Sequence, residues 1–155
     1  MPEALVLHDR REFCKQVATA AAWTGGLALL SACGGNPAGA TQGSPLAQIS
    51  GSVANGGVSV PVAAGGPLAN AGAMAMVTST AGNFLVARTS ASQFVAVTAN
   101  CTHDACVVSN ATLSSYVCPC HGSEFDTSGR VIVGPAVTPL RQFQTQFSNN
   151  VLIIS

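Results

Sequence analysis

The 155-residue sequence is poor in charge and in aromatic side chains: only 8% of its residues are charged, and it has one Trp and one Tyr. Lys and Arg balance Asp and Glu at six each, so the chain lacks the excess of positive charge that nucleic-acid binding requires. We therefore expect no nucleic-acid partner. A surface with so few charges is compatible with a secreted protein. The charged residues after Lys15 are Arg88, Asp104, Glu124, Asp126, Arg130 and Arg141.

A helical pattern and an internal repeat are also missing after residue 33. No stretch there places apolar residues at the 3.6-residue spacing of an amphipathic helix. Short apolar runs, several rich in β-branched residues, are instead separated by Gly, Asn and Ser, which is typical of strands joined by turns. These runs are 49–62, 73–77, 84–87, 94–97, 116–117, 131–133, 143–147 and 151–154. We therefore predict a single all-β domain over residues 46–155.

The first 33 residues have the features of a targeting signal. Arg10 and Arg11 are followed by Phe13 and by an apolar stretch over 17–30, which is the pattern of a twin-arginine signal. A helix over 17–30 would be about 21 Å long, shorter than the ~30 Å hydrocarbon core of a membrane. We therefore expect export by the twin-arginine route, to the periplasmic side of a bacterial membrane, without a permanent transmembrane anchor.

The signal ends in Leu30-Ser31-Ala32-Cys33, which resembles the cleavage box of bacterial lipoproteins. We expect Cys33 to become the lipidated first residue of the mature protein; the alternative is cleavage at a small-residue site beside an incidental cysteine. Residues 34–45 are uncharged and rich in Gly and Pro, which predicts a flexible tether spanning about 20 Å. The tether either lets the domain move between partners or only separates it from the membrane.

Two short boxes in the second half of the chain carry its most distinctive chemistry: CTHDAC (101–106) and CPCHGS (118–123). Each box offers one Cys and one His at close spacing, together with a spare Cys. Two thiolates and two imidazoles suit either zinc or a [2Fe-2S] cluster with both histidines on one iron. Zinc fingers usually pair Cys with Cys and His with His, whereas Cys and His alternate here. This order favours the cluster.

The two boxes resemble those of the Rieske iron–sulfur family. The stretch EFDTSGRVIVGPAVTPL (124–140) is similar to the third, proline-containing loop of that family. The resemblance covers about the last hundred residues and implies a Rieske-type antiparallel β-sandwich with a cluster-binding subdomain inserted between strands. It also implies that one iron is bound by Cys101 and Cys118, and the other by His103 and His121. Finally, it implies a disulfide between Cys106 and Cys120.

The resemblance also implies that three residues in or just after the boxes affect the reduction potential. Ser123 is similar to a family serine whose hydroxyl donates to a cluster sulfide and favours the reduced form. Phe125 stands where quinol-oxidising members have a tyrosine that donates a second such bond, so we expect a lower potential than in that branch. Asp104 replaces an apolar residue of the same branch, and its carboxylate disfavours the addition of negative charge.

The function that the resemblance implies is electron transfer, as a component of an oxidoreductase rather than as a catalyst on its own. We expect an exported, lipid-anchored carrier or the small subunit of a periplasmic oxidoreductase. Its redox partner would be a c-type cytochrome, a cytochrome b or a larger catalytic subunit. Two alternatives remain open at this point. One is the Rieske subunit of a quinol–cytochrome c reductase, and the other is a non-redox surface lipoprotein stabilised by zinc.

Overall fold

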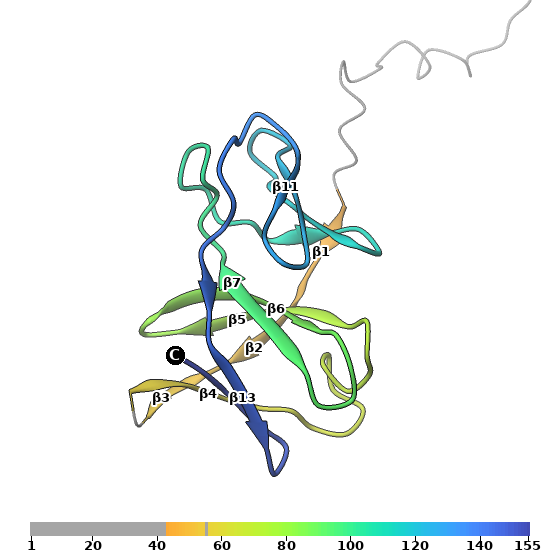
Figure 1. Cartoon of the computed structure of the whole chain (residues 1–155), viewed down its shortest axis with the longest axis vertical. Helices are drawn as coiled ribbons and strands as arrows, with labels where there is room; N and C mark the ends of the chain where they lie inside the picture. Colours follow the sequence, from red (N-terminus) through yellow and green to blue (C-terminus); the bar gives the residue numbers. More distant parts are fainter. Residues whose placement is uncertain (1–42, 55) are drawn as a thin grey trace, which may run out of the picture. The chain divides into compact units, whose positions relative to one another are not determined.

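Figure 1 shows the computed structural model, which describes residues 43–54 and 56–155. The predicted signal, Cys33 and the predicted tether up to residue 42 lie outside these residues. The described part consists of strands and turns, so the all-β prediction is confirmed. Within it, no helix is long and apolar enough to span a membrane.

The strands form three sheets. The insert sheet has the order β1-β8-β9-β10-β11 and contains β1 (Ser44–Pro45), β8 (Asn110–Ala111), β9 (Ser115–Val117), β10 (Glu124–Asp126) and β11 (Val131–Val133). The central sheet has the order β12-β7-β6-β5-β2 and contains β2 (Ala47–Ser50), β5 (Met74–Ser79), β6 (Gly82–Arg88), β7 (Phe94–Thr98) and β12 (Gln142–Phe143). The C-terminal sheet has the order β13-β14-β4-β3 and contains β3 (Ser52–Ala54), β4 (Gly57–Pro61), β13 (Thr145–Ser148) and β14 (Val151–Ile154).

In sequence, strands β8 to β11 of the insert sheet lie between two neighbouring strands of the central sheet. Strands β7 and β12 are hydrogen-bonded neighbours, with Val97 opposite Gln142. Residues 99–141 therefore leave the central sheet at the end of β7 and return to it beside the same strand (Figure 1). This is the inserted subdomain that the resemblance implies, and it contains both Cys/His boxes.

The ladders are antiparallel with one exception: β2 pairs with β5 in parallel, with Ile49 opposite Val77. Tight turns connect the antiparallel neighbours where the sequence predicts them. β5 and β6 are joined through Thr80 and Ala81, and β13 and β14 through Asn149 and Asn150. Both asparagines have left-handed backbone angles, as the two-residue hairpin turn that matches strand twist requires.

Successive residues of a strand point to opposite faces of the sheet. In the central sheet, side chains on both faces are buried. In β6, Phe84 and Val86 belong to one core, which also contains Leu152 and Ile154 of the C-terminal sheet. The intervening Leu85 belongs to a second core, which continues into the insert and includes the two cysteines 101 and 118. The two Cys/His boxes therefore share a packed interior with the central sheet.

The N-terminal boundary of the domain differs from the prediction. Ser44 and Pro45, expected at the end of the tether, form β1 and lie opposite Ala111 and Asn110 of β8. The Leu46 N–H then donates to the Ser109 carbonyl at 2.8 Å. The tether prediction is therefore wrong at its last two residues, because their partner strand lies more than sixty positions away in sequence.

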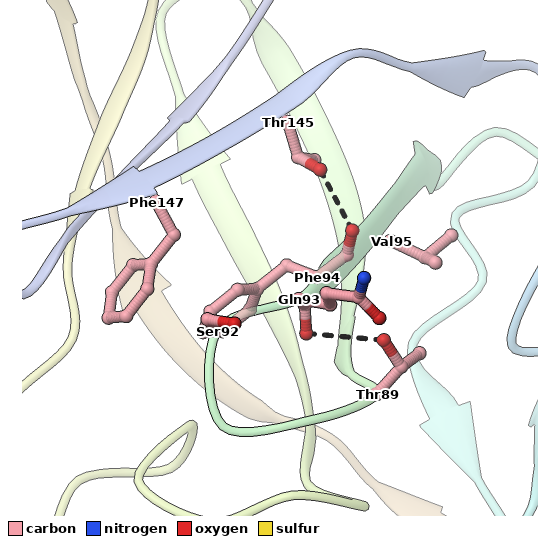
Figure 2. A pocket seen from close by; sticks show the side chains of 7 residues that line it. All are labelled: Thr89, Ser92, Gln93, Phe94, Val95, Thr145 and Phe147. Atoms are coloured by element: carbon pink, nitrogen blue, oxygen red, sulfur yellow. Dashed lines mark hydrogen bonds between the residues drawn. The ribbon is translucent and has the colours of Figure 1, made fainter.

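One cavity of about 350 Å³ lies outside the insert, where the segment leading into β7 meets β13 (Figure 2). The Thr145 hydroxyl donates to the Phe94 carbonyl at 2.8 Å, and the Thr89 hydroxyl donates to the Gln93 carbonyl at 3.2 Å. None of the residues lining this cavity is ionisable, and none belongs to the two boxes.

Candidate metal centre

The first box forms a tight loop directly after β7. The Cys101 N–H donates to the Cys106 carbonyl and the Ala105 N–H donates to the Cys101 carbonyl, each at 2.8 Å. Ala105 has a left-handed φ of 49°, which turns the chain back on itself. The loop buries the Cys101 side chain and leaves the His103 ring exposed.

The second box forms a similar loop directly after β9. The Cys118 N–H donates to the Ser123 carbonyl at 2.8 Å, and the Gly122 N–H donates back to the Cys118 carbonyl at 3.0 Å. Gly122 has a φ of +74°, a conformation that L-residues with side chains rarely adopt. Cys118 is buried and His121 is exposed, as in the first loop.

A disulfide between Cys106 and Cys120 joins the two loops, as the resemblance implies. The other two cysteines of the boxes, Cys101 and Cys118, are free thiols. Because the spare cysteines are bonded to each other, they leave the thiols that the resemblance assigns to the metal available for it.

The structure sorts the four proposed ligands into two like pairs. The Cys101 and Cys118 thiols are hydrogen-bonded to each other in the interior. The His103 and His121 rings meet edge to face at the surface, with centroids 4.9 Å apart. Burial raises the pKa of the Cys118 thiol and the Cys101 thiol raises it further, while N–H groups of the Cys120 and His121 backbone oppose this by donating to its sulfur.

Residues 134–138, which follow β11 within the stretch 124–140 and are called the third loop from here on, are hydrogen-bonded to the loops of both boxes. The Ala136 N–H donates to the Ser123 hydroxyl oxygen at 3.0 Å in the interior. The Thr102 hydroxyl donates to the Thr138 carbonyl at 2.6 Å at the surface. The sequence pattern links this loop with the two boxes but predicts no role for Thr102. Its acceptor is a backbone carbonyl, which leaves no trace in residue type.

The residues expected to tune the centre lie at different depths. Ser123 and Phe125 are fully buried, and Phe125 shares a core with Cys101 and Cys118. Asp104 is exposed beside His103. Tyr116, for which the sequence predicts no role, is also fully buried in this core, and its hydroxyl has no hydrogen-bond partner among the described residues. The one available signal was its position two residues before a ligand cysteine.

This donor set fits a [2Fe-2S] cluster held by two thiolates on one iron and two imidazoles on the other. The thiols are adjacent, buried and free of the disulfide, and backbone N–H groups already point at the Cys118 sulfur. Within the described residues, no protein atom accepts the hydrogen of the buried Ser123 hydroxyl, so this donor is available to a bound group. In the same part of the chain, no three Cys, His, Asp or Glu side chains converge on one point as a single metal ion would require.

Comparison with known proteins gives a consistent family match. The sequence model of the Rieske [2Fe-2S] domain matches residues 59–144, more than half of the chain. The cytochrome b6-f complex iron-sulfur subunit of Chlorobaculum thiosulfatiphilum is 39% identical over 61 residues, covering 39% of this chain and 34% of that protein. The subunit of the same name from Prochlorococcus marinus (strain MIT 9211) is 51% identical over 41 residues, covering 26% of this chain and 23% of that protein.

Among solved structures, the plasma membrane Rieske protein PetC3 from Synechocystis PCC 6803 is 35% identical to this chain. The match covers 53% of this chain and 85% of that structure, with a TM-score of 0.47. The chain spans about a third of the length of these curated relatives, or less.

Proposed function

This chain belongs to the Rieske [2Fe-2S] domain family, and we propose on this basis that it is an exported one-electron carrier with the ligands Cys101, His103, Cys118 and His121. When bound, the cluster takes up and releases one electron at a time. The two buried thiols would hold one iron in the interior, where the protein excludes water. The two exposed imidazoles would hold the other iron at the surface, where a partner protein can approach.

The observation that carries this proposal is the separation of the ligands into a buried thiol pair and an exposed imidazole pair. Buried sulfur ligands are protected from water and oxidants, while imidazoles whose rings lie at the surface provide a short path for an electron. The disulfide and the hydrogen bonds within both loops support this arrangement of the side chains. The zinc-stabilised lipoprotein considered from the sequence is set aside, because the Rieske domain family binds a [2Fe-2S] cluster.

We further propose twin-arginine export, cleavage before Cys33 and lipidation of that residue. Support comes from the paired arginines, the short apolar stretch and the lipoprotein-like box. The relatives include a plasma membrane Rieske protein and subunits of cytochrome b6-f complexes, which agrees with work at a membrane. A c-type cytochrome, a cytochrome b or a larger catalytic subunit would meet the exposed histidine end.

A second candidate role is the Rieske subunit of a quinol-oxidising cytochrome complex. The names of the curated relatives favour it. Two residues favour the separate carrier or small subunit instead, because Phe125 lacks a hydroxyl and the exposed Asp104 adds negative charge beside His103. Copurification from native membranes, with a cytochrome b or with another catalytic subunit, separates the two roles.

The test of the proposed function is the metal content and spectrum of the protein purified after anaerobic expression. We expect two irons and two sulfides per chain and an EPR signal that develops only on reduction. Cys101→Ser and His121→Ala should each lose this signal, whereas Asp104→Asn, an exposed neighbour of a ligand, should keep it. One zinc per chain and no colour would overturn the proposal.

The test of lipidation is Cys33→Ser, which should release the protein from membranes. Retention of this variant in the membrane after a high-salt wash would refute lipidation.

A further inference from the structure

The three loops around the candidate centre are tied to one another in a closed ring. The disulfide Cys106–Cys120 joins the first loop to the second. The Ser123–Ala136 hydrogen bond joins the second to the third, and the Thr102–Thr138 hydrogen bond joins the third back to the first. We propose that Thr102 is a positioning residue: through the third loop, it orients the Ser123 hydroxyl toward the cluster. This inference rests on the proposed function.

Ser123 is the residue whose geometry is being set. Its carbonyl accepts the Cys118 N–H at 2.8 Å, which fixes its backbone beside a thiol ligand. Its hydroxyl oxygen accepts the Ala136 N–H at 3.0 Å, so one lone pair is engaged on the side of the third loop. The hydroxyl hydrogen must then point away from Ala136, and no atom of the described protein accepts it. The direction of this donor therefore depends on where the third loop holds Ala136.

The third loop is itself held by few hydrogen bonds. Between β11 and Leu140, the described structure records two hydrogen bonds that attach the loop to its surroundings: those of Ala136 and Thr138. The next hydrogen bond along the chain lies beyond the loop, where the Leu140 N–H donates to the Gly129 carbonyl. Loss of the Thr102 hydroxyl would leave the loop with one of these two hydrogen bonds, that of Ala136 to Ser123, besides the packing of the buried Ala136 side chain in the core. The exposed threonine thereby controls a buried donor in another loop.

The experiment replaces Thr102 by Val in the full-length, cluster-loaded protein, which removes the hydroxyl at nearly constant volume. We expect a lower reduction potential than wild type, by less than Ser123→Ala lowers it, because the donor is misdirected rather than deleted. Hydrogen exchange at the Ala136 amide should accelerate by roughly 2–10-fold, the factor for loss of one net hydrogen bond. The double variant with Ser123→Ala should have the same potential as Ser123→Ala alone, since Thr102 acts through Ser123.

Two variants serve as controls. Thr138→Ala keeps the backbone carbonyl that accepts the Thr102 hydroxyl, so its potential and its Ala136 exchange should match wild type. Thr102→Ser keeps the hydroxyl and should match wild type as well. If Thr102→Val does not retain a cluster, Thr102→Ser decides the question, because a lowered potential in that variant would overturn the inference.

The inference is also overturned if Thr102→Val keeps both the wild-type potential and the wild-type amide exchange. Additive shifts in the double variant would overturn it too, because Thr102 would then act independently of Ser123. These outcomes are distinct from failure of the proposed function, which would show as a wild-type protein without iron, sulfide or the reduced-state EPR signal.

Discussion

Phe125 lies directly opposite Tyr116 across the antiparallel ladder of β10 and β9. Directly paired residues point to the same face of a sheet, so the two rings are neighbours. Both side chains are fully buried in the core that also contains Cys101 and Cys118. One ring carries a hydroxyl that no group in the described part of the chain satisfies, and the other ring has no hydroxyl. The pair therefore bears on both the stability of the fold and the reduction potential of the proposed cluster.

The Tyr116 hydroxyl should make the fold sensitive to alkaline pH. Burial raises the pKa of Tyr116 above its ordinary value near 10. The folded state therefore keeps the phenol protonated where the unfolded chain ionises. This contribution to stability is complete below about pH 10 and decreases as the pH rises further. Because Tyr116 is the only tyrosine of the chain, phenolate absorbance reports on this residue alone, and we expect it to develop together with unfolding.

Tyr116→Phe is the matched variant for this prediction. It keeps the ring and removes an unsatisfied buried hydroxyl, so we expect the free energy of unfolding at pH 7 to rise by about 1 kcal/mol. Thermal unfolding at pH 7 and at pH 11 should show a smaller alkaline loss in the variant than in wild type. A variant that is less stable at pH 7 would mean that a buried water satisfies the hydroxyl. Phenolate absorbance that develops near pH 10 in folded protein would refute the raised pKa.

The disulfide should stabilise the centre against loss of metal. Cys106 and Cys120 are 14 positions apart, and closing a loop of this size in the unfolded chain stabilises the folded state by about 3 kcal/mol in the chain-entropy model. Replacing both by Ser should leave all four ligands in place but lower the melting temperature. The variant should also release iron to a chelator faster than wild type. Equal melting temperatures and equal release rates would contradict this role.

Asp126 should make the fold sensitive to acid. Burial alone would raise the pKa of its carboxyl, but hydrogen bonds from Ser128 and Arg130 outweigh burial and lower it. This contribution is therefore present above the unfolded pKa near 4 and is lost as the pH falls through the lower, folded value. Asp126→Asn should melt a few degrees below wild type at pH 6. The difference should shrink toward pH 3; a constant difference would exclude the carboxylate charge as its cause.

The family of the chain could be predicted from the two Cys/His boxes because each box is a contiguous run in which residue type carries the chemistry. The strands leading into them could be predicted as well, since Phe94 to Val97 and Tyr116 to Val117 are apolar runs that end at a ligand cysteine. The all-β class followed from the absence of helical spacing. In each case the signal lies within a few consecutive residues.

The contacts that the sequence did not predict join residues far apart in the chain. The Thr102 hydroxyl binds a carbonyl 36 positions away, and β1 pairs with β8 through backbone groups. Strand β10 has one buried residue, Phe125, between two partly exposed acids, which is too short an alternation to recognise. The parallel pairing of β2 with β5 depends on the path of the whole chain and has no local signature.

The side chain at position 125 should affect the reduction potential. Phe125→Tyr adds a hydroxyl to a ring that lies in the same core as both thiol ligands. The resembling high-potential proteins use a tyrosine at this position to donate to a ligand sulfur. A donor of this kind stabilises the reduced form, which carries one more negative charge. We therefore expect the reduction potential to rise, which protein-film voltammetry would measure.

The size of the shift follows from the strength of one hydrogen bond. A net hydrogen bond contributes about 0.5–1.5 kcal/mol, and only the part that is stronger in the reduced state counts. At ~59 mV per 1.4 kcal/mol for one electron, the rise should be roughly 20–60 mV. Tyr116→Phe/Phe125→Tyr, which moves the hydroxyl across the ladder, should show the same rise if Phe125 alone faces the ligands. An unchanged or lower potential in Phe125→Tyr with an intact cluster spectrum would mean that this ring does not reach a ligand sulfur. The expectation of a potential below that of the quinol-oxidising branch would then lose its main support.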